Sequence, residues 1–206
     1  MSDVPSRAAR PSSRPHESVG DRAAADLRFI RHAMERTSAF TAVPGAGGMV
    51  MGLIGAAAAV AASMQPSPER WLAVWLSAAA AGFVVGLVTI SWKCRRLGTL
   101  LSGALARNFA VALVAPLAAG AGMTFALWSQ RAYPAMPAAW LLMYGAGVVT
   151  GGMFSVRAVR LAGMMFMLCG FAAAFTPPAW GNAWLGVGFG LVHIVSGFYI
   201  VRHHGG

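Results

Sequence analysis

Acidic residues are scarce in this chain and nearly disappear after its first 44 residues. Six of the 206 residues are Asp or Glu, and only Glu69 follows residue 44. Charged residues make up 11% of the chain and hydrophobic residues 57%, whereas about a quarter of an ordinary soluble domain is charged. This composition excludes a soluble globular protein. It predicts an all-α polytopic membrane protein, because long apolar segments cross a bilayer as helices.

Carboxylates are also absent from the interior of every long apolar run. Proton-coupled carriers commonly use a carboxylate relay within the membrane, and an intramembrane metal site needs ligands. Cysteine is rare as well: Cys94 follows a lysine and Cys169 lies within an apolar run, so we expect them at different depths, without a disulfide. We therefore expect no catalytic residues, no cofactor and no metal site, and a protein that is not an enzyme.

The net charge of +10 comes from 16 basic residues, which occur in small groups between apolar segments. A nucleic-acid-binding protein gathers its basic residues into a patch or stripe, so nucleic acid is not an expected partner. Scattered cations are instead typical of a chain that crosses a lipid bilayer repeatedly. The abundance of Arg, Ala, Gly and Pro, which have GC-rich codons, favours a bacterial source.

Six apolar segments are each near the length needed to cross about 30 Å of hydrocarbon at about 1.5 Å per residue. We predict a six-helix transmembrane domain over residues 45–201, with spans at 45–63, 71–92, 108–128, 138–156, 158–176 and 180–201.

The connections between these segments differ in charge. Those on one side hold ten cations, namely Arg28, Arg31, Arg36, Lys93, Arg95, Arg96, Arg107, Arg157, Arg160 and Arg202, whereas those on the other side hold only Arg70 and Arg131. By the positive-inside rule, both termini are expected in the cytoplasm, with the domain in a bacterial inner membrane. An even number of spans agrees with that orientation.

The first 40 residues have a different pattern. Residues 1–20 are rich in Pro, Ser and Arg and lack apolar periodicity, so we expect a disordered cytoplasmic tail. In residues 21–40, Leu27, Ile30 and Met34 recur at helical spacing, with arginines on the other faces. This pattern predicts an amphipathic interfacial helix that binds anionic lipid at the cytoplasmic face.

Glycine pairs four residues apart place small residues on one face of several predicted spans. Such pairs let two helices approach closely. They favour ordinary packing inside one bundle, and a homo-oligomer interface is the alternative. The pairs are Gly48 and Gly52, Gly82 and Gly86, Gly147 and Gly151, and Gly186 and Gly190.

His193 is the one ionisable side chain predicted near mid-membrane. Three roles are open to it: a structural hydrogen bond within the bundle, a proton or ligand site, and metal binding, of which we favour the first. Asn108 and Thr124 complete the candidate intramembrane polar site. Pro116 should kink the third span, because proline leaves the carbonyl of Ala112 without its helical partner. That kink can be static or act as a gate.

Two stretches resemble a group of uncharacterised small bacterial six-span membrane proteins. The resemblance implies the six-span architecture and implies no activity. The residues that carry it are Phe40-Thr41-Ala42-Val43-Pro44-Gly45, and His193-Ile194-Val195 with Gly197, Arg202 and Gly205-Gly206.

Three classes of function are compatible with this sequence. We favour a non-catalytic scaffold or accessory subunit that packs with itself or with another membrane protein, because the apolar segments lack acids and the loops are short. A small six-span transporter or channel is the alternative, on the strength of Pro116 and His193. A membrane enzyme ranks third, since catalysis needs polar groups clustered at one depth.

Overall fold

The structure is a computed structural model that describes residues 20, 26–27, 44–97 and 104–204. The chain divides into two compact units, Met1–Ser38 and Ala39–Gly206. In the first unit only Gly20, Asp26 and Leu27 are described, and all three are helical. The predicted tail at residues 1–20 and the predicted amphipathic helix at residues 21–40 therefore lie almost entirely outside the described residues.

The described part of the second unit consists of helices joined by short turns and contains no strands, which confirms the predicted all-α fold class. Its five longer helices before the last segment are α2 (Gly45–Ser63), α3 (Pro68–Leu97), α4 (Ala104–Ser129), α5 (Met136–Gly152) and α6 (Arg157–Phe175). A short 3-10 helix, η1 (Tyr133–Ala135), leads into α5. The last segment runs through η2 (Pro178–Trp180), α7 (Gly181–Leu185), the π-helical η3 (Gly186–Val192) and α8 (His193–His204).

Five helical segments of the described chain are long and apolar enough to cross a membrane. They are Gly45–Ser63, Pro68–Arg96, Ala106–Ser129, Arg157–Phe175 and Pro178–His203. The predicted fourth span corresponds to α5, which has 17 residues and is not among the five.

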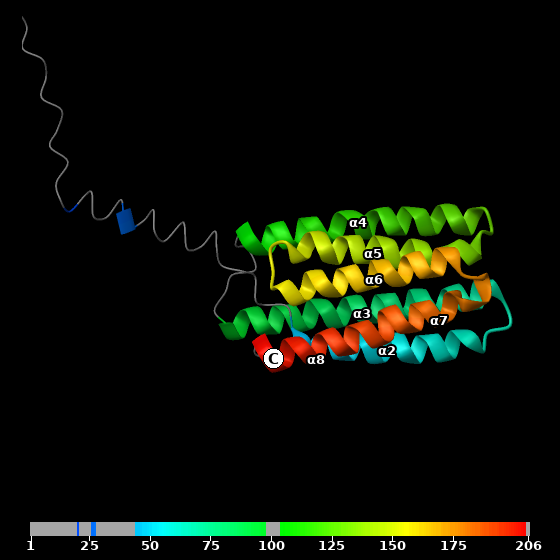
Figure 1. Ribbon diagram of the computed structural model, residues 1–206, viewed down its shortest axis with the longest axis horizontal. Helices are drawn as coiled ribbons and strands as arrows, with labels where there is room; N and C mark the ends of the chain where they lie inside the picture. Colours follow the sequence, from blue (N-terminus) through cyan, green and yellow to red (C-terminus); the bar gives the residue numbers. More distant parts are fainter. Residues whose placement is uncertain (1–19, 21–25, 28–43, 98–103, 205–206) are drawn as a thin grey trace, which may run out of the picture. The chain divides into compact units, whose positions relative to one another are not determined.

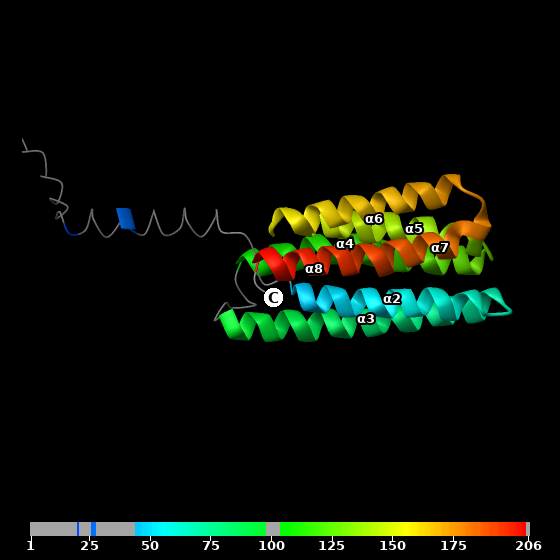
Figure 2. The same ribbon diagram turned by 60° about the horizontal axis from the view of Figure 1, so that its bottom comes forward.

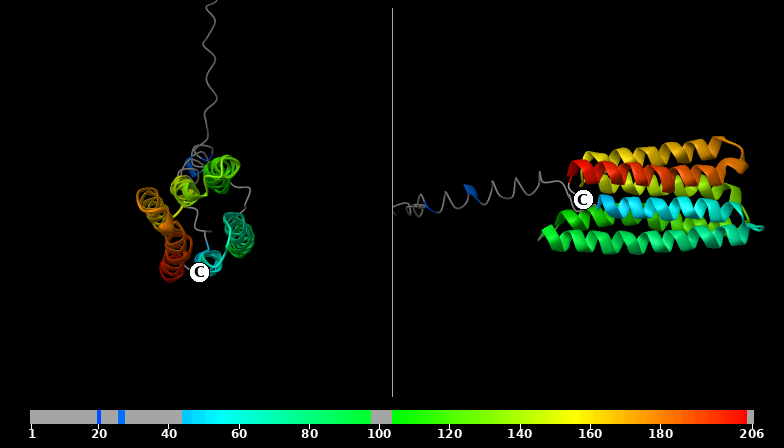
Figure 3. Two further views of the ribbon diagram at one scale, coloured as in Figure 1. Left: turned by 90° about the vertical axis from the view of Figure 1, so that its right-hand side faces the viewer. Right: turned by 90° about the horizontal axis from the view of Figure 1, so that it is seen from below.

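The helices lie side by side and alternate in direction, so that all connections fall at two ends (Figure 1). We call one the basic end, where α3, α5 and α8 finish and α4 and α6 begin. The other is the tryptophan end, where α2, α4 and α6 finish. Viewed end-on, α4, α5 and α6 form one row, and α8, α2 and α3 continue from it (Figure 3).

The main core lies where α2, α3, α5, α6 and α7 meet. Phe166, Leu141 and Leu185 are almost completely buried there. A smaller cluster at the basic end joins Cys94 of α3 to Ala106 and Phe109 of α4. Elsewhere α3 and α4 are the least buried of the long apolar helices. In the most apolar stretch of each, 6% is buried inside the structure, against 33 to 39% in α2, α6 and the last segment.

The turn between α5 and α6 differs from the prediction. The predicted fourth span continued to Val156, but α5 ends at Gly152 and α6 begins at Arg157. The predicted spans left one residue, Arg157, to reverse the chain, which is too short for two antiparallel helices. The turn uses Met153 to Val156 instead, and Gly152 permits it because a side chain there would meet the backbone of Arg160.

Candidate functional site

His193 lies at the centre of the bundle, at the first residue of α8. It is 8% exposed. Nδ1 of its ring lies 3.1 Å from the carbonyl oxygen of Phe189, and Nε2 lies 2.7 Å from the hydroxyl of Tyr144. One neutral tautomer satisfies both bonds: Nδ1–H donates to the carbonyl, and Nε2 accepts from the tyrosine O–H. Tyr144 is the middle residue of α5, which places His193 at half the length of that helix.

Aromatic rings enclose this pair. The ring of Phe166, the middle residue of α6, lies 4.7 Å from that of His193 and 4.9 Å from that of Tyr144. The ring of Phe189 lies 5.2 Å from that of Tyr144. Phe189 belongs to η3, a π-helical segment that ends immediately before His193. The imidazole therefore has partners for both nitrogens and packs against apolar rings.

The other two residues of the predicted polar site lie elsewhere. Asn108 is exposed in the first turns of α4. Thr124 lies 16 residues further along the same helix, about 24 Å away at 1.5 Å per residue. Its hydroxyl donates to the carbonyl of Gly120 at 2.7 Å and accepts from Nε1 of Trp140 at 2.8 Å. The structure thus does not bring Asn108, Thr124 and His193 together.

Pro116 lies inside α4, which continues on both sides of it. The carbonyl of Ala112, which proline leaves without its helical partner, accepts a hydrogen bond from the hydroxyl of Thr150 on α5 at 2.8 Å. The same hydroxyl lies 2.9 Å from its own helix's carbonyl at Ala146. A polar side chain of a neighbouring helix thus compensates for the proline, which favours a static role for Pro116 over a gate.

Replacing Thr150 by valine should therefore loosen the contact between α4 and α5. Valine keeps the shape and removes the hydroxyl, so we expect a loss of about 0.6 to 2 kcal/mol in unfolding free energy. Unfolding in mixed detergent micelles, followed by helical circular dichroism, measures it. Serine keeps the hydroxyl and should restore most of the stability. Equal losses for valine and serine would show that the hydroxyl does not matter.

Glycines of α2 face glycines of the last segment. A Cβ on Gly48 would lie 3.3 Å from Cα of Gly197, and a Cβ on Gly52 would lie 2.8 Å from the carbonyl oxygen of Gly190. Gly190 in turn faces Ala56 at 3.3 Å. These backbones approach closely because Gly48 and Gly52 of α2, and Gly190 and Gly197 of the last segment, carry no side chain at the crossing.

The remaining predicted glycines differ in their surroundings. Gly147 and Gly151 of α5 face Leu113 and Phe109 of α4. Gly186 faces Ala59, at 3.0 Å from the added Cβ. Gly82 and Gly86 of α3 have only Met51 near them, at 3.9 and 3.8 Å. Gly147, Gly151 and Gly186 thus lie in helix–helix contacts within the chain, whereas the glycine pair of α3 is loosely packed.

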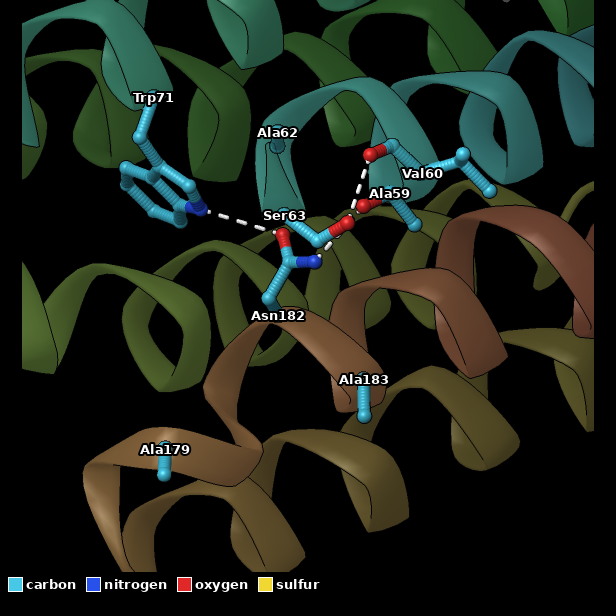
Figure 4. A pocket seen from close by; sticks show the side chains of 8 residues that line it. All are labelled: Ala59, Val60, Ala62, Ser63, Trp71, Ala179, Asn182 and Ala183. Carbon is cyan, nitrogen blue, oxygen red and sulfur yellow. Dashed lines mark hydrogen bonds between the residues drawn. The ribbon is translucent and has the colours of Figure 1, made fainter. Parts of the chain in front are cut away.

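Asn182, which the sequence analysis did not single out, ties three helices together at the tryptophan end. Its Oδ1 accepts from Nε1 of both Trp71 and Trp75, each at 3.1 Å. Its Nδ2 donates to the carbonyl of Ala59 at 2.8 Å, and Figure 4 shows this bond together with the one from Trp71. These partners fix the orientation of the amide, since an indole N–H can only donate and a carbonyl can only accept. Trp71 and Trp75 are one helical turn apart on α3, and this spacing was the available sequence clue.

A network of aromatic and polar side chains continues around this end. The rings of Trp71 and Trp140 stack at 5.5 Å with 5° between their planes, and Nε1 of Trp184 donates to Thr176 at 2.9 Å. In the connection before α5, the Tyr133 hydroxyl donates to Glu69 at 3.3 Å. Next to this network, a pocket of about 540 Å³ lies between α2, α3, η2 and α7.

The chain matches no family model, no curated protein and no solved structure. In the part of the chain that the structure describes, no three His, Cys, Asp or Glu side chains are grouped so that they could hold a metal ion.

Proposed function

We propose that this chain is a six-span inner-membrane protein and acts as a non-catalytic scaffold or accessory subunit, packing with itself or with another membrane protein. The observation that carries the proposal is the packing of His193. Both of its ring nitrogens already have partners, and aromatic rings surround it. An interior histidine used in this way stabilises a bundle, because a satisfied polar group in an apolar core fixes the positions of its neighbours.

The geometry of α5 supports a sixth span. The 3-10 helix η1 leads directly into it, so the helical stretch runs from Tyr133 to Gly152. At about 2.0 Å per 3-10 residue and 1.5 Å per α-helical residue, this stretch is about 31 Å long, near the thickness of the hydrocarbon layer. It also lies between α4 and α6 (Figure 2), and both of these helices are long and apolar enough to cross a membrane.

The distribution of charge at the two ends of the bundle supports cytoplasmic termini. The basic end holds seven of the ten cations that the sequence assigns to the cytoplasmic side, namely Lys93, Arg95, Arg96, Arg107, Arg157, Arg160 and Arg202. The tryptophan end holds Arg70 and Arg131. By the positive-inside rule the basic end faces the cytoplasm, where it can also attract anionic lipid.

Reporter fusions test this topology directly. Fusions after Arg96 and after Arg160 should report the cytoplasm, and fusions after Pro68 and after Pro134 should report the opposite side. Paired alkaline phosphatase and fluorescent-protein reporters give opposite readouts on the two sides, so each position carries its own control. Reversed results at any two of these positions would contradict the six-span arrangement.

The accessory role predicts a partner on the outer face of α3, which together with α4 is one of the two least buried spans. A tagged chain extracted in mild detergent should co-purify in fixed stoichiometry with another membrane protein or with a differently tagged second copy. Val84→Trp on α3 should reduce that recovery at least tenfold. Leu168→Trp on α6, where Leu168 is 58% exposed and Val84 57%, is the matched control and should have little effect. Equal recovery for both variants would contradict this surface.

A small transporter or channel is the second candidate, and one observation favours it. The π-helical segment η3 ends at His193, and π-helical turns inside α-helices are frequent at functional sites. Under this hypothesis the helix rearranges around His193 during transport. Solute flux in proteoliposomes that contain only this chain, abolished by changing His193 alone, would favour this role over the accessory one.

A further inference from the structure

The pocket at the tryptophan end combines a mainly apolar lining with one unused hydrogen-bond donor. Its other side-chain donors are occupied, since the Ser63 hydroxyl donates to the carbonyl of Val60 and the Trp71 N–H donates to Asn182. Four alanines supply much of its surface, namely Ala59, Ala62, Ala179 and Ala183, and Figure 4 shows them around Asn182. Its volume of about 540 Å³ lies within the roughly 300 to 1,000 Å³ common for small-molecule sites. Small side chains thus leave a hollow between α2, α3, η2 and α7.

The unused donor belongs to Asn182. Its amide nitrogen carries two hydrogens, and among the described residues it has one acceptor, the carbonyl of Ala59. Its oxygen is occupied by two indole N–H groups, which fixes the amide orientation. The side chain therefore offers a single N–H to a ligand that carries a carbonyl or another neutral acceptor. No acidic or basic side chain lines the pocket, so the ligand needs no charge at that point.

The position of the pocket along the helices indicates which class of ligand it binds. Asn182 lies within two helical turns of Pro178, where the last segment begins at the tryptophan end. Tryptophans surround it there, and tryptophan is enriched at the boundary between hydrocarbon and headgroups. The ester carbonyls of glycerophospholipids lie at this boundary, with acyl chains directly beneath them. A lipid ester thus offers both the acceptor and the apolar chain that the pocket can take.

We propose that this pocket binds one glycerophospholipid of the leaflet at the tryptophan end. An ester carbonyl accepts the second N–H of Asn182, and the adjoining acyl chain lies against the alanines. The site rests on the proposed placement of the bundle in a membrane and is independent of whether the protein has a protein partner.

Native mass spectrometry of the full chain in detergent tests the site. The probes are dioleoyl phosphatidylethanolamine and its dialkyl ether analogue, which has the same headgroup but lacks both carbonyls. Wild-type protein should hold one ester lipid about fivefold more tightly than the ether lipid, which is the effect expected of one neutral hydrogen bond. Equal affinity for the two lipids would overturn the proposal.

Two leucine variants locate the lipid. Ala183→Leu fills the pocket and should abolish the preference for the ester lipid. Ala61→Leu is the matched control, because Ala61 is an exposed alanine at the same end that does not line the pocket, and it should keep the preference. A preference that survives Ala183→Leu would place the lipid elsewhere and overturn the site. Membrane fractionation and partner recovery, measured on the same variants, show separately whether the proposed function has failed.

Discussion

Replacing Gly55 by alanine should destabilise the bundle by about 1 to 3 kcal/mol, whereas the same change at Gly122 should be neutral or stabilise it by up to about 1 kcal/mol. A Cβ on Gly55 would collide with the carbonyl group of Phe189 and lie 3.0 Å from the backbone nitrogen of Gly190. Backbone atoms cannot rotate away as a flexible side chain can, so α2 and η3 would have to separate. The loss of their contacts outweighs the gain that alanine brings to a helix.

Gly122 provides the opposite environment in a helix of similar composition. Nothing lies within 4 Å of a Cβ added there, so only the helix propensity changes, and alanine exceeds glycine by up to about 1 kcal/mol. Both variants should be measured by detergent unfolding with helical circular dichroism, in the same micelles. If both glycines respond with the same sign, the close approach of α2 and η3 is wrong.

Much of the helical framework could be predicted from the sequence, because apolar runs and the charges between them are local properties. The first predicted span, residues 45–63, has the same limits as α2. Prediction was poorer where two helices are joined by a tight turn. The end of α5 depends on how closely Gly152 approaches Arg160 in space, and hydropathy carries no information about that approach.

The candidate site was harder to predict, because its geometry depends on partners distant in the sequence. Hydropathy identified His193 as an interior residue, but its partner Tyr144 lies 49 positions earlier. Asn182 bonds to Trp75 across 107 positions. A single sequence does not indicate which distant residues become partners in the folded structure. The role of Thr150 is intermediate, since the orphan carbonyl of Ala112 follows from Pro116 alone, whereas the hydroxyl that occupies it does not.

The pair formed by His193 and Tyr144 should have the second large effect. His193→Leu removes the acceptor of the tyrosine hydroxyl, which leaves a buried O–H group without this partner. It also removes the side-chain donor to the Phe189 carbonyl. We expect a loss of about 1 to 3 kcal/mol in unfolding free energy. His193→Gln keeps one donor and one acceptor on a side chain of similar reach, and should cost less than about 1 kcal/mol.

A double-mutant cycle isolates the bond itself. Tyr144→Phe removes only the hydroxyl, and the double variant with His193→Leu lacks both ends of the bond. If the two side chains interact directly, the double variant should lose about 0.6 to 1.7 kcal/mol less than the sum of the single losses, the range found for interhelical hydrogen bonds in a membrane. Additive losses would show that the 2.7 Å contact contributes nothing to stability.

The glutamine variant also separates the two proposed functions. Glutamine can replace the hydrogen bonds of a structural histidine, but it cannot bind and release a proton near neutral pH. An accessory subunit should therefore keep its partner recovery and its unfolding free energy when His193 becomes Gln. A transporter that uses the imidazole for proton transfer should fold normally and lose its flux. A folded but inactive Gln variant would overturn the accessory role, because packing alone gives no reason for activity to depend on a titratable ring.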